Sequence, residues 1–366
     1  MTSGLLPVIK LCLLILMATA VSLCSATSQG SIKCLFSDID GTLVHYYETE
    51  EDGPAPGPPK VLALPPSKTG RQAFISRDTL DLVARIRAKG TRFVLISGVR
   101  YSTFAARLPF LPRADAYVIE NGGRIFYPRD DEDLVMDGSA EKTNATQEDN
   151  RAVPITAHPA EALVEDLAWR EQLTPATGPA SQDAIPPGER TGPLWDVFRQ
   201  LVDGAYTVDT ATYFTMLRVK IEEEETRVGV RTSVEQGKKR TGAGQGRGKG
   251  SNQSLSHLLG LLPAGLRVVT NFGLVDICPE RSGKLNAAVH IATKRFGISL
   301  ENCASMGDDD NDIDIAKAMG KGAFITGFSS QSIADAAKAN SAQFRVARER
   351  GVRAAEEMLQ LVLQSC

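Results

Sequence analysis

Two aspartates spaced two residues apart are the first side chains in the chain that could do chemistry. Asp38 and Asp40 follow the apolar run 34–36 and are succeeded by Gly41 and Thr42. Side chains two apart on an extended segment point the same way, so both carboxylates can face one pocket. Carboxylates this close repel each other unless a cation or a shared proton relieves them, and Mg2+ prefers such oxygen ligands. An ordinary strand that ends in an Asp-Gly turn would leave the same pattern.

Three further polar clusters follow predicted strands. They are Ser97 with Gly98, then Lys284, and then the acidic run 308–312. In open α/β sheets ligands bind at the carboxyl ends of the strands, so these clusters can meet the two aspartates. Together they supply what phosphoryl transfer needs: one carboxylate attacks phosphorus and a second moves a proton. A metal, a lysine and a hydroxyl neutralise the phosphoryl oxygens.

Apolar runs and amphipathic stretches alternate along most of the chain. Strand, helix and strand at this spacing predict right-handed crossovers and a parallel sheet, which is the α/β fold class. Besides the strand before Asp38, the predicted strands are 91–96, 116–119, 124–127, 266–269, 273–277, 304–306, 323–326 and 344–346. The predicted helices are 76–90, 101–108, 284–296, 313–319, 332–337 and 352–363.

The pattern changes between residues 127 and 266, where a small α+β module is predicted to interrupt the sheet domain. Its predicted elements are helices 159–173 and 194–202 and strands 212–221 and 226–234. Proline, glycine and polar residues predict irregular loops at 48–71, 130–154 and 236–254. The predicted domains are a presequence at 1–30, a sheet-domain segment at 31–127, the insertion at 128–265 and a second sheet-domain segment at 266–366.

The first 30 residues are similar to a cleavable secretory signal peptide or an organelle presequence. Residues 11–24 are apolar and contain small residues that suit cleavage. We therefore expect the secretory pathway or an organelle, with an uncleaved membrane anchor as the alternative. On the secretory route Asn144 and Asn252 would be potential glycosylation acceptors. The four cysteines beyond this segment show no metal-binding spacing, so buried free thiols are expected.

Charge argues against a nucleic-acid partner. The formal net charge is −3, which favours neither nucleic acid nor an anionic membrane surface. The segment 236–254 is basic and rich in glycine, but it has no aromatic residues on which bases could stack. We therefore expect a loop there, and contact with a membrane only if the N-terminal apolar segment is not cleaved.

The four clusters, in this order, resemble the motifs of the haloacid dehalogenase (HAD) superfamily of hydrolases. Residues 38–42 resemble DxDGT, Ser97-Gly98 resembles the second motif, Lys284 the third, and residues 307–312 the GDxxND motif. The place of the insertion is similar to that of a type II cap. The resemblance implies a Rossmann-like three-layer parallel-sheet core with an inserted α+β cap domain.

Residues 118–123 and 276–279 are similar to the subclass-B group of this superfamily. That group includes sucrose-phosphate phosphatases, trehalose-phosphate phosphatases, Cof-type phosphatases and eukaryotic phosphomannomutases. One departure is Val99, which separates Gly98 from Arg100, where many relatives have arginine directly after the glycine.

The resemblance implies a role for each motif residue. Asp38 would be the nucleophile that forms an aspartyl-phosphate, and Asp40 would be the general acid and base. Mg2+ would bind Asp38, the Asp40 carbonyl, Asp308 and Asp312, supported by Asn311, and the phosphoryl oxygens would contact Thr42, Ser97, Gly98 and Lys284. The expected substrate contacts are Asn121 and, on the predicted strand 212–221, Thr215, Arg218 and Lys220.

The predicted function is a Mg2+-dependent phosphatase that hydrolyses a small phosphate monoester, with a sugar phosphate as the leading substrate. A flavin-pathway phosphate and pyridoxal phosphate are the other substrates that the sequence leaves open. One alternative is a sugar phosphomutase of the phosphomannomutase type, which uses the same nucleophile. The other is a non-catalytic binding protein on a HAD scaffold. The sequence leaves the oligomeric state open.

Overall fold

The computed structural model describes residues 30–46, 61–67, 70–129, 162–220, 255–271 and 274–366. Every described helix and strand belongs to the compact unit of residues 32–366. The predicted presequence, the glycosylation acceptors Asn144 and Asn252, the loops 130–154 and 236–254 and the strand 226–234 lie outside the described residues. Within the described ranges, no helix has both the length and the apolar character that crossing a membrane requires.

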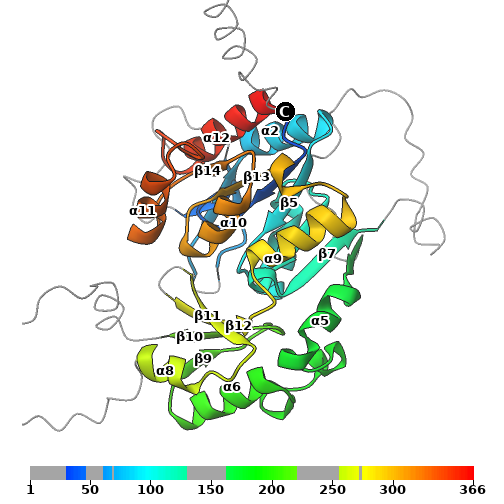
Figure 1. Ribbon diagram of the computed structural model, residues 1–366, viewed down its shortest axis with the longest axis vertical. Helices are drawn as coiled ribbons and strands as arrows, with labels where there is room; N and C mark the ends of the chain where they lie inside the picture. The colour runs from blue at the N-terminus through cyan, green and yellow to red at the C-terminus, as the bar shows by residue number, and fades with distance from the viewer. Residues whose placement is uncertain (1–29, 47–60, 68–69, 130–161, 221–254, 272–273) are drawn as a thin grey trace, which may run out of the picture. The chain divides into compact units, whose positions relative to one another are not determined.

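The large sheet has eight strands in the order β15-β14-β13-β1-β5-β6-β7-β8 (Figure 1). The strands from β15 to β6 are parallel, whereas β7 and β8 are antiparallel to their neighbours. The predicted α/β class is thereby confirmed. The strands are β1 (Cys34–Ser37), β5 (Arg92–Ile96), β6 (Ala116–Ile119), β7 (Arg124–Pro128), β8 (Leu163–Glu165), β13 (Cys303–Gly307), β14 (Ala323–Ile325) and β15 (Phe344–Val346).

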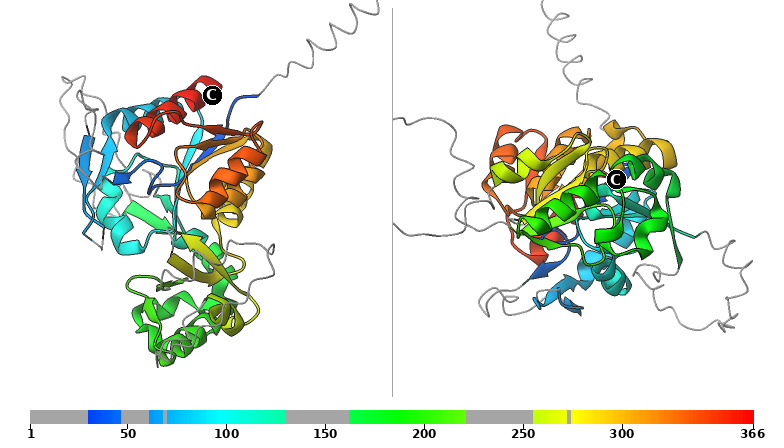
Figure 2. Two further views of the ribbon diagram at one scale, coloured as in Figure 1. Left: turned by 90° about the vertical axis from the view of Figure 1, so that its left-hand side faces the viewer. Right: turned by 90° about the horizontal axis from the view of Figure 1, so that it is seen from below.

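Helices cover both faces of this sheet, which gives the predicted three layers (Figure 2). Successive side chains of β1 point to opposite faces. Leu35 packs on one side with α2 (Arg77–Ala88) and α12 (Val352–Ser365). Phe36 packs on the other side with α9 (Lys284–Val289) and α10 (Ile313–Ala318). Because both faces are buried, β1 and β5 are apolar without alternation.

The remaining helices of the sheet domain also match their predicted positions. Ser76 caps α2 by accepting hydrogen bonds from the amides of Asp78 and Thr79 at 3.0 and 3.4 Å, as helix N-caps do. The helix predicted at 101–108 is α3 (Tyr101–Arg107), and the helix predicted at 332–337 is α11 (Gln331–Ala339). The helix predicted at 284–296 is α-helical only as far as Val289 and continues as a π-helical turn, His290–Arg295.

A second sheet belongs to the inserted module, which we define as residues 167–279. Its antiparallel order is β11-β12-β10-β9, with β9 (Thr207–Asp209) and β10 (Leu217–Lys220). It packs with α6 (Pro193–Asp203) around the buried Trp195 and so has a core of its own. The predicted α+β insertion is thereby confirmed, and α5 (Leu167–Thr177) and α8 (Leu255–Leu261) complete it.

The predicted boundary at residue 266 is wrong. The strands β11 (Leu266–Asn271) and β12 (Leu274–Pro279) pair with each other and with β10, not with the large sheet. Short apolar runs of this kind suit a buried parallel strand as well as a strand of a small antiparallel sheet. The second segment of the large sheet therefore begins at β13.

Three other expectations differ from the structure. Part of the helix predicted at 159–173 is the strand β8, because α5 begins only after its N-cap Asp166. The strand predicted at 212–221 is limited to β10. The segment 48–71 contains β3 (Val61–Leu64), which pairs with β4 (Ala73–Ser76) and, through it, with β2 (His45–Tyr46). Pairing with β4 outweighed the nearby prolines.

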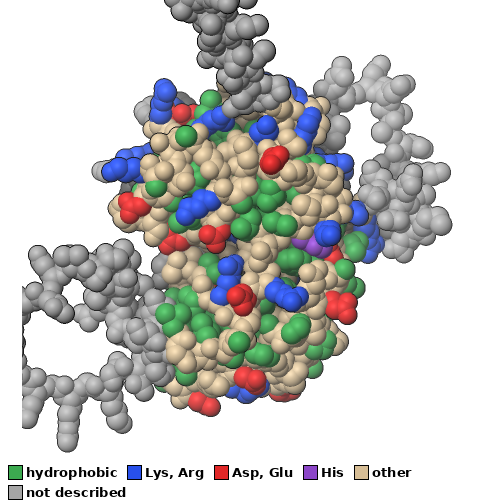
Figure 3. Space-filling model, in the orientation of Figure 1, with side chains coloured by type: hydrophobic (Ala, Val, Ile, Leu, Met, Phe, Trp, Pro, Cys, Tyr) green, Lys and Arg blue, Asp and Glu red, His purple; other side chains and the backbone are tan. Residues whose placement is uncertain are grey.

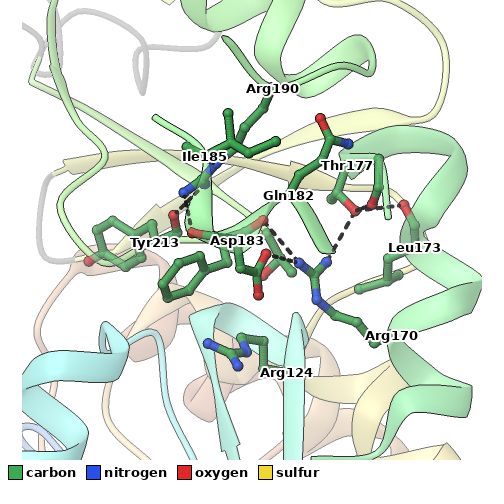
Figure 4. A network of polar contacts seen from close by, with 12 residues as sticks. Arg124, Arg170, Leu173, Thr177, Gln182, Asp183, Ile185, Arg190 and Tyr213 are labelled. Atoms are coloured by element: carbon green, nitrogen blue, oxygen red, sulfur yellow. Dashed lines mark hydrogen bonds and ion pairs between the residues drawn. The ribbon is translucent and has the colours of Figure 1, made fainter. Parts of the chain in front are cut away.

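A network of arginines fixes the irregular part of the inserted module (Figure 4). Arg170 on α5 donates to Thr177 at 3.1 Å and to the carboxylate of Asp183 at 2.7 Å. Arg190 donates to three backbone carbonyls, those of Asp183, Ile185 and Tyr213. Both guanidiniums are buried, so each satisfies carbonyl or carboxylate oxygens that would otherwise lack partners.

We expect Gly122→Ala to destabilise the protein more than Gly90→Ala. Both glycines have left-handed φ, +86° and +88°, which costs an alanine about 1–2 kcal/mol. At Gly122 an added Cβ would also lie 2.4 Å from the backbone oxygen of Gly283, whereas at Gly90 it would meet nothing within 4 Å. Urea unfolding should therefore show a further loss of about 1–3 kcal/mol for Gly122→Ala. Equal losses would contradict the close approach of these two backbone segments.

Candidate active site

The first motif turns sharply after β1 and meets the fourth motif. The amide of Asp38 donates to the carbonyl of Met306, at the end of the neighbouring β13, at 3.0 Å. Gly41 has φ +83°, and a Cβ there would lie 2.1 Å from an Asp308 carboxylate oxygen. Only glycine combines this backbone conformation with this approach. The hydroxyl of Thr42 donates to Asp308 at 2.9 Å, so it positions this acid.

Three predicted metal ligands gather at one point. Asp38, Asp308 and Asp312 are buried, and each offers a carboxylate oxygen within 4.8 Å of the others. Lys284, at the start of α9, lies among them, with its Nζ 2.9 Å from Asp38 and 2.7 Å from Asp312. The structure thus brings together residues from three of the predicted motifs.

The burial of these acids raises their pKa values. Loss of solvent raises the pKa of Asp38 to about 8, although Lys284 acts in the opposite direction. Burial and the neighbouring aspartates also raise the pKa of Asp308, and burial raises that of Asp312. Burial lowers the pKa of Lys284, but the two aspartates outweigh it, so the net shift is upward and the ammonium stays charged.

The charge balance of this cluster fits a divalent cation. Three carboxylates face a single ammonium in a buried site, so ionising all three leaves a negative surplus that a buried site disfavours. Mg2+ takes carboxylate oxygens and keeps further positions for water or phosphate. Asp38, Asp308 and Asp312 would hold it.

Asp40 has different neighbours. Its Oδ1 accepts hydrogen bonds from the hydroxyl of Tyr46 at 2.5 Å and from Nη1 of Arg107 at 2.8 Å. Nη1 of Arg107 also donates to the Tyr46 oxygen at 2.8 Å, and this arginine is only 2% exposed. Because both donors reach Oδ1, Asp40 is held in one orientation. Neither Tyr46 nor Arg107 was predicted as a site residue, since neither lies in a motif, and a buried arginine in a short helix gives no signal of its partner.

A pocket of about 400 Å3 opens beside these acids. The sheet domain contributes Asp38, Asp40, Ser97, Gly98, Arg100, Arg107 and Asn311 to its lining, and the inserted module contributes Asp209, Tyr213, Arg218 and Leu274. Ser67 and Arg71, which belong to the segment predicted as a plain loop, line it as well. The predicted residues Ser97 and Gly98 therefore face the same space as the two catalytic candidates.

The four predicted substrate contacts fall in different places. Arg218 lines the pocket and pairs with the buried Asp276 through two contacts of 2.6 and 2.7 Å. Thr215 is fully buried, its hydroxyl donates to Glu120 at 2.7 Å, and it lies outside the lining of the pocket. Asn121 is buried as well. Lys220 is exposed on β10 and lies outside the lining of the pocket.

Polar contacts attach the inserted module to the sheet domain. Asn121 donates to Asp276 at 2.7 Å and accepts from Asn311 at 3.1 Å, which connects the fourth motif to the module. Arg100 forms an ion pair with Asp209 and donates to the carbonyl of Ala211 at 2.8 Å. Arg100 is therefore engaged with the inserted module.

Glu120 makes a further connection between the two parts. It is fully buried, and one of its carboxylate oxygens accepts from the amides of Phe214 and Thr215 at 2.9 and 2.7 Å. Burial raises the pKa of this carboxyl, and Arg124 acts against that rise. Glu120 and Asn121 both have left-handed φ, 54° and 52°. Such strain persists only where the surroundings hold it in place, and here their side-chain contacts with the module do so.

Residues 251–351, which include Lys284, Asp308 and Asp312, match the family model of haloacid dehalogenase-like hydrolases. The resemblance to the HAD superfamily is confirmed. The match supports the predicted hydrolase class for this segment. The comparison with curated proteins finds no match.

Solved structures of several phosphatases are similar to this chain over most of their length. The sucrose-phosphatase from Synechocystis sp. PCC6803 is 14% identical, with 91% of this chain and 98% of that chain covered and a TM-score of 0.49. A HAD-superfamily phosphatase from Bacteroides thetaiotaomicron is 15% identical, with 91% and 95% covered and a TM-score of 0.44. A HAD subclass IIB sugar phosphatase is 15% identical, with 90% and 99% covered and a TM-score of 0.43.

We expect Mg2+ to stabilise this chain through Asp308. A ligand that binds only the folded state stabilises it by about 2.7 kcal/mol at a hundred times its dissociation constant. Asp308→Asn should remove this gain. Without metal the same variant should melt at a higher temperature than the wild type, because one carboxylate leaves the repelling cluster. Thermal melting with and without MgCl2 measures both effects.

Asp310→Asn is the matched control for this experiment. Asp310 lies in the same loop but binds Thr270 and Ser330 instead of the acid cluster. This variant should keep the gain from Mg2+. A gain in Asp308→Asn as large as in the wild type would show that the metal binds elsewhere.

Proposed function

We propose that the chain hydrolyses a small phosphate monoester through an aspartyl-phosphate on Asp38, with Mg2+ as cofactor. The observation that carries this proposal is the pair of carboxylates in one pocket with separate supports. Asp38 lies against Lys284, whereas Asp40 is held by Tyr46 and Arg107. Two acids in different surroundings suit two roles, one nucleophile and one proton carrier.

The reaction proceeds in two displacements at phosphorus. In the first, a carboxylate oxygen of Asp38 forms a bond to phosphorus, and the leaving oxygen takes a proton from Asp40. In the second, Asp40 takes a proton from a water whose oxygen attacks phosphorus, which releases phosphate and restores Asp38. Lys284 fixes the Asp38 carboxylate and contributes positive charge beside the phosphoryl group. Bound Mg2+ would neutralise the negative charge on the phosphoryl oxygens.

The pocket supports a small polar substrate, and we infer a sugar phosphate as the leading candidate. Its volume of about 400 Å3 falls in the range of small-ligand sites. The inserted module contributes a carboxylate, a phenol and a guanidinium to the lining, from Asp209, Tyr213 and Arg218. These groups can donate to and accept from sugar hydroxyls.

Glucose 6-phosphate, mannose 6-phosphate and mannose 1-phosphate, each tested with Mg2+, separate hydrolysis from phosphomutase activity. We expect phosphate to be released from at least one of them. An isomerised sugar without free phosphate would establish the mutase alternative. Inactivity on a wider panel of phosphate esters would contradict the proposed function.

We expect Asp38→Asn to lower the rate of phosphate release by at least about 1,000-fold, because the amide cannot replace the nucleophile. Asp40→Asn should keep the nucleophile but lose the base. With p-nitrophenyl phosphate, whose leaving group needs no proton, this variant should accumulate phosphate on Asp38. Mass spectrometry of the quenched protein detects the modified peptide, and Asp310→Asn, which should keep wild-type activity, is the control.

We expect Arg107→Met to lower kcat about 10- to 100-fold and to change KM little. Arg107 contacts Asp40 and Tyr46, so its loss frees the orientation of the proton carrier, whose contribution to the rate is typically about 100-fold or more. Arg107→Lys keeps one donor and should recover part of kcat. Steady-state kinetics measures the effects on kcat and on KM separately. A rise in KM at constant kcat would instead indicate a role in binding substrate.

A further inference from the structure

A second hollow, with a volume of about 410 Å3, lies at the opposite end of β5 from the candidate active site. Its lining includes Arg92, where β5 begins, and Asp115, just before β6. Ser97 and the active-site pocket follow the other end of β5. The full length of the strand separates the two, so a ligand in this hollow does not occupy the substrate pocket.

The lining of this hollow is strongly basic. It contains one acidic residue, Asp115, and five arginines: Arg87, Arg92, Arg113, Arg129 and Arg295. Figure 3 shows basic side chains near the ends of β7 and of the helix that follows α9. Five guanidiniums around one carboxylate leave a large positive surplus.

The single carboxylate is already saturated. Asp115 accepts from Arg87 at 3.1 Å, from Arg92 at 3.0 Å and from the amide of Phe93 at 2.9 Å. Although its partial burial acts in the opposite direction, these donors lower the pKa of this carboxyl. Arg129 has a partner of its own. Arg113 and Arg295 form no ion pair with the described residues, so they provide the charge that is available to a ligand.

Each of the two aromatic rings in the lining already has an arginine guanidinium over its face. The guanidinium of Arg295 lies 4.8 Å from the centre of the Tyr127 ring, and that of Arg92 lies 5.4 Å from the centre of the Phe296 ring. Such contacts hold the guanidinium planes in fixed orientations. The rings therefore orient the arginines, and the hollow presents N–H donors instead of a stacking surface for a base.

We propose that this hollow binds a small polyphosphorylated molecule, whose adjacent phosphates are held by the guanidiniums of Arg113 and Arg295. Arginine matches phosphate oxygens with paired N–H donors, and such charge-assisted bonds are the strong ones. The volume is that of a small-molecule site. Arg113 and Arg295, which form no ion pair with the described residues, and the two guanidiniums beside Asp115 suit several linked phosphates better than a single one.

Calorimetric titration of the full chain with inorganic tripolyphosphate, with Mg2+ in excess over the probe, tests this proposal. We expect Arg113→Gln/Arg295→Gln to bind the probe at least tenfold more weakly than the wild type. Arg113 is half-buried and Arg295 is exposed, so the variant should melt as the wild type does. Its active site is intact, so its phosphate release should be unchanged.

Arg345→Gln/Arg348→Gln is the matched control, because it removes the same charge elsewhere. Arg345 lies 5.0 Å from the centre of the Phe324 ring, which reproduces the stacking of Arg295, and both control arginines lie outside the lining of the hollow. This variant should bind tripolyphosphate as the wild type does. An equal loss in the control would mean diffuse attraction between charges and would overturn the proposal, as would equal binding by the wild type and Arg113→Gln/Arg295→Gln.

Two further titrations distinguish which ligand the hollow binds. ATP should bind no more tightly than tripolyphosphate, and tenfold tighter binding would overturn recognition by phosphates alone. The chain continues beyond Arg129 into the acidic residues 130–133. If tripolyphosphate binds only after the substitutions D130N/D131N/E132Q/D133N, the hollow is occupied by the chain's own acids and the proposal is overturned.

Discussion

The structure depends on three carboxylates that are held together away from water at the ends of two parallel strands. Like charges at this distance destabilise the fold unless something compensates them. Lys284 supplies one compensating charge, from the start of a helix that packs on the back of the sheet. Gly41 allows the first motif to approach Asp308 without a clash. The demand for a cation and the need for glycine at position 41 both result from this one placement.

The two aspartates of the first motif have separate surroundings, which simple spacing does not reveal. Asp38 belongs to the acid cluster, whereas Asp40 is tied to Arg107 and Tyr46 through a single oxygen, Oδ1. Its other oxygen, Oδ2, accepts no hydrogen bond from the part of the chain that the structure describes. One oxygen therefore fixes the orientation of the carboxylate and the other can exchange a proton. This arrangement separates positioning from chemistry within one side chain.

The motifs predicted most of the site because each follows a strand, and parallel strands of one sheet bring their carboxyl ends together. Contacts that depend on pairing or on distant segments could not be predicted in this way. The hydroxyl of Thr215 donates to Glu120, a contact that no local pattern indicates. The strands β11 and β12 joined the smaller sheet because their partner is β10, and short apolar runs do not specify a partner. Arg107 reaches Asp40 across 67 positions of sequence.

The contact of Glu120 with the backbone of the inserted module has a kinetic consequence. Its carboxylate holds the amides of Phe214 and Thr215, so the module cannot swing away from the sheet domain without exposing both amides. If a substrate enters by such a movement, each entry also exposes these two protons to exchange with deuterium. Their exchange rates would therefore report how often the site opens, independently of any turnover. A single buried glutamate thus links access to the site with the rate of amide exchange, which can be measured without substrate.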